Sequence, residues 1–212
     1  MGDTRPVLQN GYVLELGCQD YYIDSVIGAG GSSIVYRAHY QDQLVAEIFH
    51  YVLIKELFPY EPDAIFRKND GSIGIMDSNG RELLEKYRQS FFRGTQLHLS
   101  LLAKEPETVS GNINSFAKHG TYYSVLPIQG GIVLRDLLET RPGDVLTAAV
   151  WLESILCALH PFHVNRVLHL DISPDNVLMF DQYSMLIDFS SVNLLAGKND
   201  RKTVRIWTRN SR

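Results

Sequence analysis

The chain has 212 residues, 45% of them hydrophobic, so it is long enough to bury a sizeable core. Its 20 basic and 24 acidic residues leave a formal net charge of −4, which argues against binding nucleic acid or an anionic membrane. Cys18 and Cys157 form no C-x-x-C pair, and we see no apolar stretch near the roughly 18 residues that span a bilayer. We therefore expect a soluble, cytoplasmic protein without a disulfide framework.

The first half of the chain is predicted to form mostly strands. Residues 21–27 and 33–39 are β-branched and aromatic runs separated by a glycine-rich tip, which predicts a hairpin. Residues 48–57 are a third strand candidate that stops at Pro59. Residues 65–76 contain Asp-Gly between two short apolar runs, which is a local signal for another small hairpin.

A helical pattern follows, and then two more strands. Residues 81–103 place apolar side chains at helical spacing, although Gly94 interrupts the run. Residues 113–116 and 121–126 then predict short strands, after which the sheet is expected to end. The side chains expected to share one face of the helix are Leu84, Tyr87, Phe91, Thr95 and Leu99.

The second half is predicted to be mainly helical. Residues 133–139 and 146–163 have helical periodicity, and residues 167–189 return to short apolar strands that alternate with polar loops. Strands first and helices second indicate two subdomains, at 1–127 and 128–212. The stripe expected to be buried on the longer helix consists of Leu146, Ala149, Leu152, Ile155, Leu156 and Leu159.

The tip of the first hairpin carries the pattern G-x-G-x-x-S-x-V. Residues without side chains let backbone N–H groups approach phosphate oxygens, and Val35 can lie against a purine ring. An ordinary glycine-rich turn explains the same residues, and no Gly-Lys-Ser/Thr follows that would make a Walker loop. The candidate nucleotide-binding residues here are Gly28, Ala29, Gly30, Gly31, Ser32 and Val35.

Lys55 follows in an apolar strand, within Val-Leu-Ile-Lys. A lysine among apolar neighbours is costly to bury unless an anion pairs with it, and ATP phosphates would supply that anion. The alternative is a lysine at a sheet edge that extends its amine to water.

Two carboxylate-containing loops lie near the end of the chain. His169-Leu-Asp-Ile-Ser-Pro-Asp-Asn176 can place the Asp171 carboxylate at an acceptor hydroxyl and an Asn176 amide oxygen on a magnesium ion. An apolar strand then ends in Asp188, a further oxygen ligand of the kind that magnesium prefers. A structural loop and a surface aspartate are the alternatives for each motif taken alone.

Together the glycine-rich hairpin, strand lysine, H-x-D-x-x-x-x-N loop and D-F-small motif resemble the eukaryotic-like protein kinase family over residues 21 to about 195. The spellings HLDISPDN and IKELFP are most similar to those of bacterial kinase-like proteins. This resemblance implies an α+β, protein-kinase-like bilobed fold. Its N-lobe, 1–127, would hold an antiparallel sheet plus a helix, and 128–212 would form a partial, C-terminally truncated helical C-lobe.

The resemblance also implies roles for single residues. Asp171 is similar to the catalytic base, Asn176 and Asp188 to the Mg²⁺ ligands, and Lys55 to the lysine that holds the α- and β-phosphates of ATP. Residues 125–131 resemble the hinge that meets adenine. The apolar candidates around adenine are Leu126, Ile128 and Leu178.

The sequence departs from this family in ways that put catalysis in doubt. Gln96 stands where we expect the glutamate that pairs with the lysine, Leu170 replaces the usual arginine, and Ser173 replaces a lysine that reaches the transferred phosphate. No Ala-Pro-Glu motif follows Asp188, and residues 202–212 read as a basic, polar tail.

We therefore expect a Ser/Thr-type protein kinase that uses ATP and Mg²⁺ and acts on a protein substrate. A small-molecule kinase of the aminoglycoside or choline type shares the H-x-D-x-x-x-x-N loop and is one alternative. A pseudokinase or nucleotide-binding scaffold is the other. The acceptor and the oligomeric state stay open.

Overall fold

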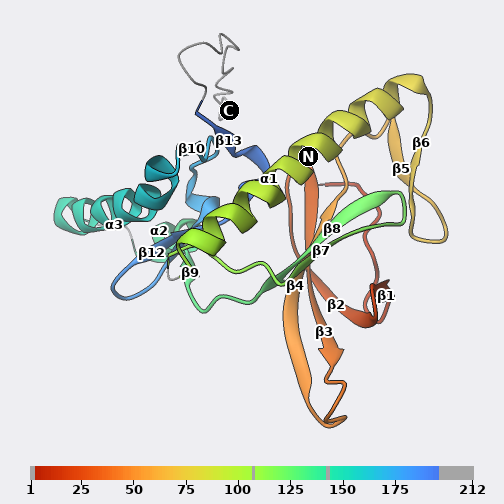
Figure 1. Cartoon of the computed structure of the whole chain (residues 1–212), viewed down its shortest axis with the longest axis horizontal. Helices are drawn as coiled ribbons and strands as arrows, with labels where there is room; N and C mark the ends of the chain where they lie inside the picture. The colour runs from red at the N-terminus through yellow and green to blue at the C-terminus, as the bar shows by residue number, and fades with distance from the viewer. Residues whose placement is uncertain (1–2, 107, 142–143, 196–212) are drawn as a thin grey trace. The chain divides into compact units, whose positions relative to one another are not determined.

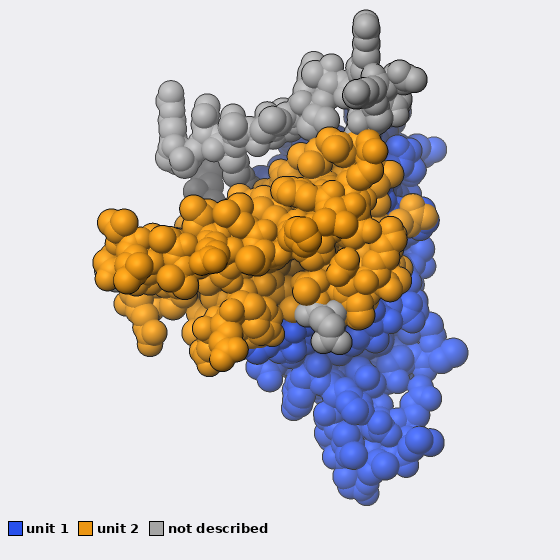
Figure 2. Space-filling view, turned by 60° about the vertical axis from the view of Figure 1, so that its left-hand side comes forward, with its two compact units in different colours: residues 1–95, 111–130 blue, residues 96–110, 131–212 orange. Residues whose placement is uncertain are grey.

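The computed structural model describes residues 3–106, 108–141 and 144–195. The chain divides into two compact units, which Figure 2 shows in different colours. Unit 1 comprises residues 1–95 and 111–130, and unit 2 comprises 96–110 and 131–212. The division thus differs from the expected one at 127/128, because residues 96–110 cluster with the second unit. Buried Leu101 and Val109 explain this, since both pack into the hydrophobic core of unit 2.

Unit 1 is built on a six-stranded antiparallel sheet (Figure 1). Buried and exposed positions alternate along much of β3, so that Ile34, Tyr36 and Ala38 face the core while Arg37 faces outward. The strand order is β1 (Val13–Leu16), β2 (Gln19–Ala29), β3 (Ser33–Gln41), β4 (Phe49–Leu57), β8 (Thr121–Pro127) and β7 (Asn114–Lys118). All the strands expected from sequence are present, and β1 is an additional one.

A small hairpin precedes the helix of unit 1. Strands β5 (Ile65–Arg67) and β6 (Ile73–Ile75) pair antiparallel around Asp70-Gly71, as the Asp-Gly signal predicts. Gly71 has a φ of +83°, a left-handed conformation that glycine adopts without a Cβ penalty.

Helix α1 (Ser78–Lys104) runs unbroken through Gly94. Leu84 and Phe91 are buried as expected, but the side chain of Leu99 is 45% exposed and His98 is buried in its place. With 3.6 residues per turn, position 98 lies within about 20° of Phe91 around the helix axis, whereas position 99 lies about 80° away. The expected face was wrong at Leu99, because successive steps of four residues drift away from the core.

Unit 2 contains two helices and short strands. Its elements are β9 (Ile132–Val133), α2 (Leu134–Thr140), α3 (Val145–Val164), β10 (Val167–Leu168), η1 (Pro174–Asn176), β11 (Val177–Met179), β12 (Ser184–Leu186), η2 (Phe189–Ser191) and β13 (Asn193–Leu194). Strands β12, β11 and β9 form one small sheet, and β10 pairs with β13. An antiparallel sheet in unit 1 and helices in unit 2 make the chain an α+β protein, as the sequence predicts.

Most of the predicted buried stripe of α3 is wrong. Leu146, Leu152 and Leu156 are 74%, 58% and 59% exposed, whereas Ala158, Leu159 and Phe162 near the C-terminal end are buried. The reason is that β12 and β10 of unit 2 pack on α3, while its N-terminal part extends beyond them (Figure 1).

Helix α3 also corrects the expectation about membrane-spanning segments. Its 20 residues have a mean hydropathy of 1.6 and are long and apolar enough, by length and composition, to cross a membrane. Scattered polar residues such as Glu153 hide this property in a search for uninterrupted apolar runs. Core helices of water-soluble proteins meet the same criterion, so α3 alone does not assign the chain to a membrane.

Candidate active site

In unit 1 the predicted nucleotide-binding residues gather on one face of the sheet. Lys55 on β4 lies directly opposite Val35 on β3, and Val35 in turn lies opposite Gly28 on β2. Leu53, two residues before Lys55 and therefore on the same face, lies opposite Leu126 on β8. The register thus places Val35, Lys55 and Leu126 on a common surface, although they are distant in sequence.

Lys55 is largely withdrawn from solvent, because only 8% of the residue is exposed. A buried ammonium requires anionic or hydrogen-bonding partners. This burial argues against the alternative in which the lysine extends freely into water.

The glycine-rich tip connects β2 and β3, and its backbone is tied to the end of β4. The N–H of Phe58 donates to the carbonyl of Ser32 (3.0 Å), and the N–H of Tyr60 donates to the carbonyl of Gly31 (2.8 Å). A Cβ added at Gly28 or Gly30 would meet no described atom within 4 Å, and neither residue has a positive φ. Folding does not demand glycine at these positions, so their use favours an outer surface left open for a ligand.

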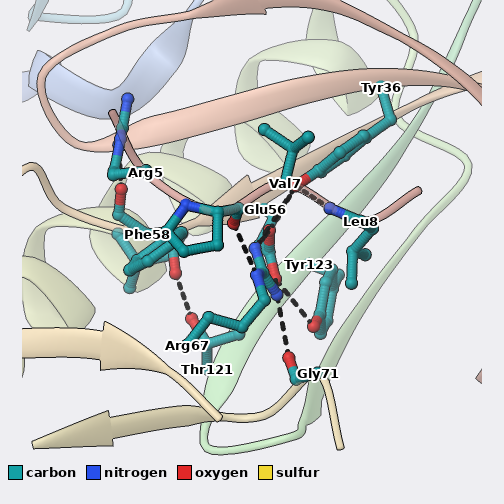
Figure 3. A network of polar contacts seen from close by, with 12 residues as sticks. Arg5, Val7, Leu8, Tyr36, Glu56, Phe58, Arg67, Gly71, Thr121 and Tyr123 are labelled. Carbon is teal, nitrogen blue, oxygen red and sulfur yellow. Dashed lines mark hydrogen bonds and ion pairs between the residues drawn. The ribbon is translucent and has the colours of Figure 1, made fainter. Parts of the chain in front are cut away.

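Glu56, the residue after Lys55, belongs to a buried ion pair with Arg67. The sequence analysis did not predict this pair. The fully buried carboxylate of Glu56 accepts hydrogen bonds from Arg67 (2.6 and 3.0 Å), Tyr36 (2.9 Å) and Tyr123 (3.0 Å), as Figure 3 shows. Successive strand residues point to opposite faces, so Glu56 anchors β4 from the face opposite to Lys55. The sequence feature that could have indicated this ion pair is a second charged residue inside the apolar run Ile-Lys-Glu-Leu-Phe.

The environment of this carboxylate keeps the neighbouring phenols protonated. Burial, together with the charge of Glu56, raises the pKa of Tyr36 and of Tyr123 far above the ordinary tyrosine value. Both hydroxyls therefore remain donors to Glu56 throughout the physiological range.

In unit 2 the two predicted carboxylate loops lie against each other. The side-chain amide of Asn176 donates to the backbone carbonyl of Asp171 (2.9 Å), and the N–H of Ile187 donates to the carbonyl of Asn176 (3.0 Å). Buried His169 donates from Nε2 to the carbonyl of Ile187 (3.1 Å). These bonds link Asp171, Asn176 and the residue before Asp188 in one constellation, which is the arrangement that the motif spacing predicts.

Two residues of these loops have a left-handed backbone. Leu170 has a φ of +64° and Asp188 a φ of +63°, and neither is glycine. Such conformations cost about 1–3 kcal/mol each and concentrate at functional sites. Both lie directly at the predicted catalytic and metal-binding carboxylates, whereas His119 and Arg166, which also have a positive φ, lie in turns elsewhere in the described chain.

Stacked rings hold the segment that follows Asp188. Phe189 stacks on His98 at 3.8 Å between ring centroids and on Phe162 at 5.5 Å. The Nε2–H of His98 donates to the carbonyl of Ser110 (2.6 Å), which orients the imidazole. His98 is a second residue that we missed, since a lone histidine in a helix carries no specific signal in the sequence.

The oxygen atoms in this region fit a magnesium ion that is completed by phosphate. The amide nitrogen of Asn176 bonds Asp171, which leaves its Oδ1 to accept from the other side. Asp188 Oδ1 accepts from the backbone N–H of Ser190 (2.9 Å), which orients its carboxylate. Over the described ranges no group of three or more His, Cys, Asp and Glu side chains is arranged to hold a metal, so phosphate oxygens would complete the coordination.

The remaining predicted residues are placed as follows. Leu178 is buried on β11, Ile128 is 45% exposed just after β8, and Gln96 is exposed on α1. Lys55 belongs to unit 1, whereas Asp171, Asn176 and Asp188 belong to unit 2, and their convergence on one nucleotide stays a prediction. The basic tail at 202–212 lies outside the described residues.

No model of a protein family matches the chain. A stretch of 77 residues, 36% of the chain, is 30% identical to 3-phosphoinositide-dependent protein kinase 1 of Caenorhabditis elegans and spans 12% of that protein. A solved structure described as "PpkA-294 apo form" matches 87% of the chain with a TM-score of 0.68 and 25% sequence identity.

The fold is that of a protein kinase. The expected protein-kinase-like α+β class is therefore confirmed, as is the general similarity to kinases. The chain spans 62% of the PpkA-294 chain and a much smaller part of the curated kinase. Activity, acceptor and cofactors are therefore matters of proposal.

Proposed function

We propose that the chain is an ATP- and Mg²⁺-dependent phosphotransferase of the protein kinase type, which transfers the γ-phosphate to a serine or threonine hydroxyl of a protein. The observation that carries this proposal is the hydrogen-bonded convergence of Asp171, Asn176 and Ile187, which precedes Asp188. Within a kinase fold, these residues correspond to a catalytic loop and a metal-binding loop.

The carboxylate of Asp171 would orient the acceptor hydroxyl and take its proton as the phosphoryl group is transferred. Its exposure suits a group that must meet a macromolecular substrate. Asn176 and Asp188 would hold Mg²⁺, which neutralises charge on the phosphates. Because catalysis in such sites is mainly positioning, the backbone bonds among these loops supply the rigidity that the chemistry needs.

Unit 1 would bind the nucleotide. Lys55 would pair with the α- and β-phosphates, and the glycine-rich tip would offer backbone N–H groups to phosphate oxygens. Val35, Leu126 and Leu178 would contact adenine, whose polar edge would meet the backbone around Ile128. The position of Lys55 supports its role, since it lies opposite Val35, which in turn lies opposite Gly28 of the glycine-rich segment.

Two observations favour a second candidate, a nucleotide-binding scaffold with little transfer activity. The only acidic residues of α1, Glu82 and Glu85, are exposed and pair with Lys86 and Arg88 on the same helix. No carboxylate of α1 is thus committed to Lys55, and Ser173 replaces the lysine that reaches the transferred phosphate. Both features weaken stabilisation of the transferred group.

Nucleotide binding is tested by thermal unfolding with ATP, with and without Mg²⁺. A ligand that binds only the folded state raises its stability, so we expect an Mg²⁺-dependent increase in melting temperature. Asp188→Asn removes one negative charge but retains an oxygen that can accept from Ser190, and it should abolish most of the increase. Asp181→Asn removes an exposed carboxylate elsewhere in unit 2. This variant should show the full Mg²⁺-dependent increase in melting temperature.

Transfer itself is tested with radiolabelled ATP and a mixture of protein acceptors. Asp171→Asn should lower the transfer rate at least a hundredfold while Mg²⁺-dependent nucleotide binding persists, since general-base catalysis contributes roughly 10²–10⁴-fold. Transfer of radiolabelled phosphate to small alcohols or amines instead of proteins would favour a small-molecule kinase. Nucleotide binding without Asp171-dependent transfer would favour the scaffold, and absence of binding would refute the proposal.

A further inference from the structure

The segment that precedes β1, residues 3–8, carries a buried arginine whose contacts lead to the glycine-rich tip. The side chain of Arg5 is only 5% exposed, although it lies near the start of the chain. Its Nη2 donates to the carbonyl of Gly30 (2.6 Å), and its Nη1 donates to the carbonyl of Phe58. The guanidinium also lies over the rings of Phe58 and Tyr60, at 5.7 and 5.8 Å from their centroids.

Asp3 holds the guanidinium in this position. Arg5 Nε donates to both carboxylate oxygens of Asp3 at 3.0 Å, and the backbone N–H of Arg5 adds a bond of 2.9 Å. These bonds also lower the pKa of Asp3, so its carboxylate is ionised at neutral pH. Asp3 thereby balances the charge of Arg5, while other guanidinium N–H groups reach the two backbone carbonyls.

The rest of the segment is fastened to the buried ion pair of unit 1. Arg67 Nε donates to the carbonyl of Pro6 (2.7 Å), and the N–H of Leu8 donates to the hydroxyl of Tyr36 (3.3 Å). Figure 3 shows Arg5, Val7 and Leu8 alongside Glu56 and Arg67. The segment thus has one anchor in the core and one contact on the glycine-rich tip.

The contact with Gly30 completes a series of three held carbonyls. Arg5, Tyr60 and Phe58 hold the carbonyls of Gly30, Gly31 and Ser32, respectively. In a trans peptide the C=O and the following N–H point in opposite directions, and the described bonds include no cis peptide. Fixing these carbonyls therefore directs the N–H groups of Gly31, Ser32 and Ser33 away from β4 and Arg5.

We propose that Arg5 is a positioning residue for nucleotide binding, which orders the backbone of the glycine-rich tip so that its N–H groups are aimed at a phosphate before the nucleotide arrives. This inference rests on the proposed function and adds a determinant outside residues 21–195. Ordering the tip in advance reduces the conformational entropy that the loop would otherwise lose on binding, which strengthens binding.

The test compares Arg5→Ala, Arg5→Lys and Asp3→Ala in the full chain, by calorimetric titration with Mg²⁺-ATP. A hydrogen bond to a charged group contributes enough that its loss should weaken nucleotide binding about tenfold in Arg5→Ala. Arg5→Lys keeps one cation for the Gly30 carbonyl and should restore part of the affinity. Asp3→Ala removes the carboxylate that orients the guanidinium but keeps the guanidinium itself, and it should weaken binding in the same direction by a smaller factor.

Arg88→Ala is the matched control, because Arg88 also donates to a glycine carbonyl of unit 1, that of Gly120. It should leave nucleotide affinity unchanged. In transfer assays Arg5→Ala should raise the KM for ATP about tenfold and lower kcat much less, since Arg5 acts on binding and not on the acceptor. A general loss of folding would not raise the KM for ATP while leaving kcat nearly unchanged.

Hydrogen exchange of the nucleotide-free protein gives a readout that needs no ligand. The amides of Gly30, Phe58 and Tyr60, whose hydrogen bonds hold the tip, should exchange faster in Arg5→Ala than in the unaltered protein, with the other strands of unit 1 unchanged. Equal nucleotide affinity in the unaltered protein and Arg5→Ala would overturn this inference while the proposed function stands. Failure of the unaltered protein to bind nucleotide would overturn the proposed function, and this inference with it.

Discussion

The two units are held together by different chemistry. Unit 1 has a buried ion pair at its centre, in which Glu56 and Arg67 are joined by the hydroxyls of Tyr36 and Tyr123. Unit 2 has a stack of rings instead, in which Phe189 lies between His98 and Phe162. Each cluster is adjacent in sequence to a predicted site residue, since Glu56 follows Lys55 and Phe189 follows Asp188.

The two clusters position their neighbouring site residues in different ways. A buried ion pair tolerates little change, because loss of one partner leaves an uncompensated charge in a low-dielectric interior. A ring stack depends on shape and on weak attractions that other apolar side chains partly replace. Substitutions in the cluster beside Lys55 should therefore cost more stability than substitutions in the cluster beside Asp188.

The largest expected effect follows from breaking the ion pair of unit 1. Glu56→Gln keeps the volume but leaves the buried Arg67 guanidinium without its counterion, which should lower the free energy of unfolding by about 3–5 kcal/mol. Urea unfolding measures this loss, and hydrogen exchange should locate it in the strands of unit 1. Glu15→Gln, which alters the half-exposed pair with Lys118 in the same unit, should change stability by less than about 1 kcal/mol.

A smaller effect is expected from the ring stack of unit 2. Phe189→Leu retains an apolar side chain but removes the stacking on His98 and Phe162, which should cost about 1–2 kcal/mol. Faster hydrogen exchange should then appear in residues 187–192 and leave the sheet of unit 1 unaffected. A loss as large as that of Glu56→Gln would contradict the contrast between the two units.

The smallest expected effect concerns how folding stability declines at alkaline pH. Burial and the charge of Glu56 raise the folded pKa of Tyr123, whereas an unfolded tyrosine titrates near 10.0. Stability from this hydroxyl is therefore complete below pH 10 and declines as pH rises above it, because the unfolded state then loses its proton first. Tyr123→Phe should cost about 1 kcal/mol at pH 7 and make the decline in urea midpoint above pH 10 shallower. Identical alkaline slopes in the two proteins would show that Tyr123 does not titrate differently on unfolding.

Sequence alone predicted most of the elements of unit 1 and the local geometry of the loop that contains Asp171. The loop from His169 to Asn176 is short, so its spacing constrains geometry locally, and the bond from Asn176 to the Asp171 carbonyl fulfils that constraint. The β-branched and aromatic residues of β3 likewise made this strand predictable from its own sequence. The left-handed backbone at Leu170 and Asp188 was not foreseeable, because no glycine marks it.

Tertiary structure decided the features that depend on distant partners. Nothing local indicates that Arg5 donates to Gly30, that Arg67 neutralises Glu56, or that His98 stacks on Phe189. The periodicity of α3 predicted a continuous buried stripe, but burial requires a surface to pack against, and only the C-terminal part of the helix has one within the described chain. Short-range spacing in the sequence therefore determined which functional groups lie together in a loop, whereas long-range packing determined which contacts hold them in place.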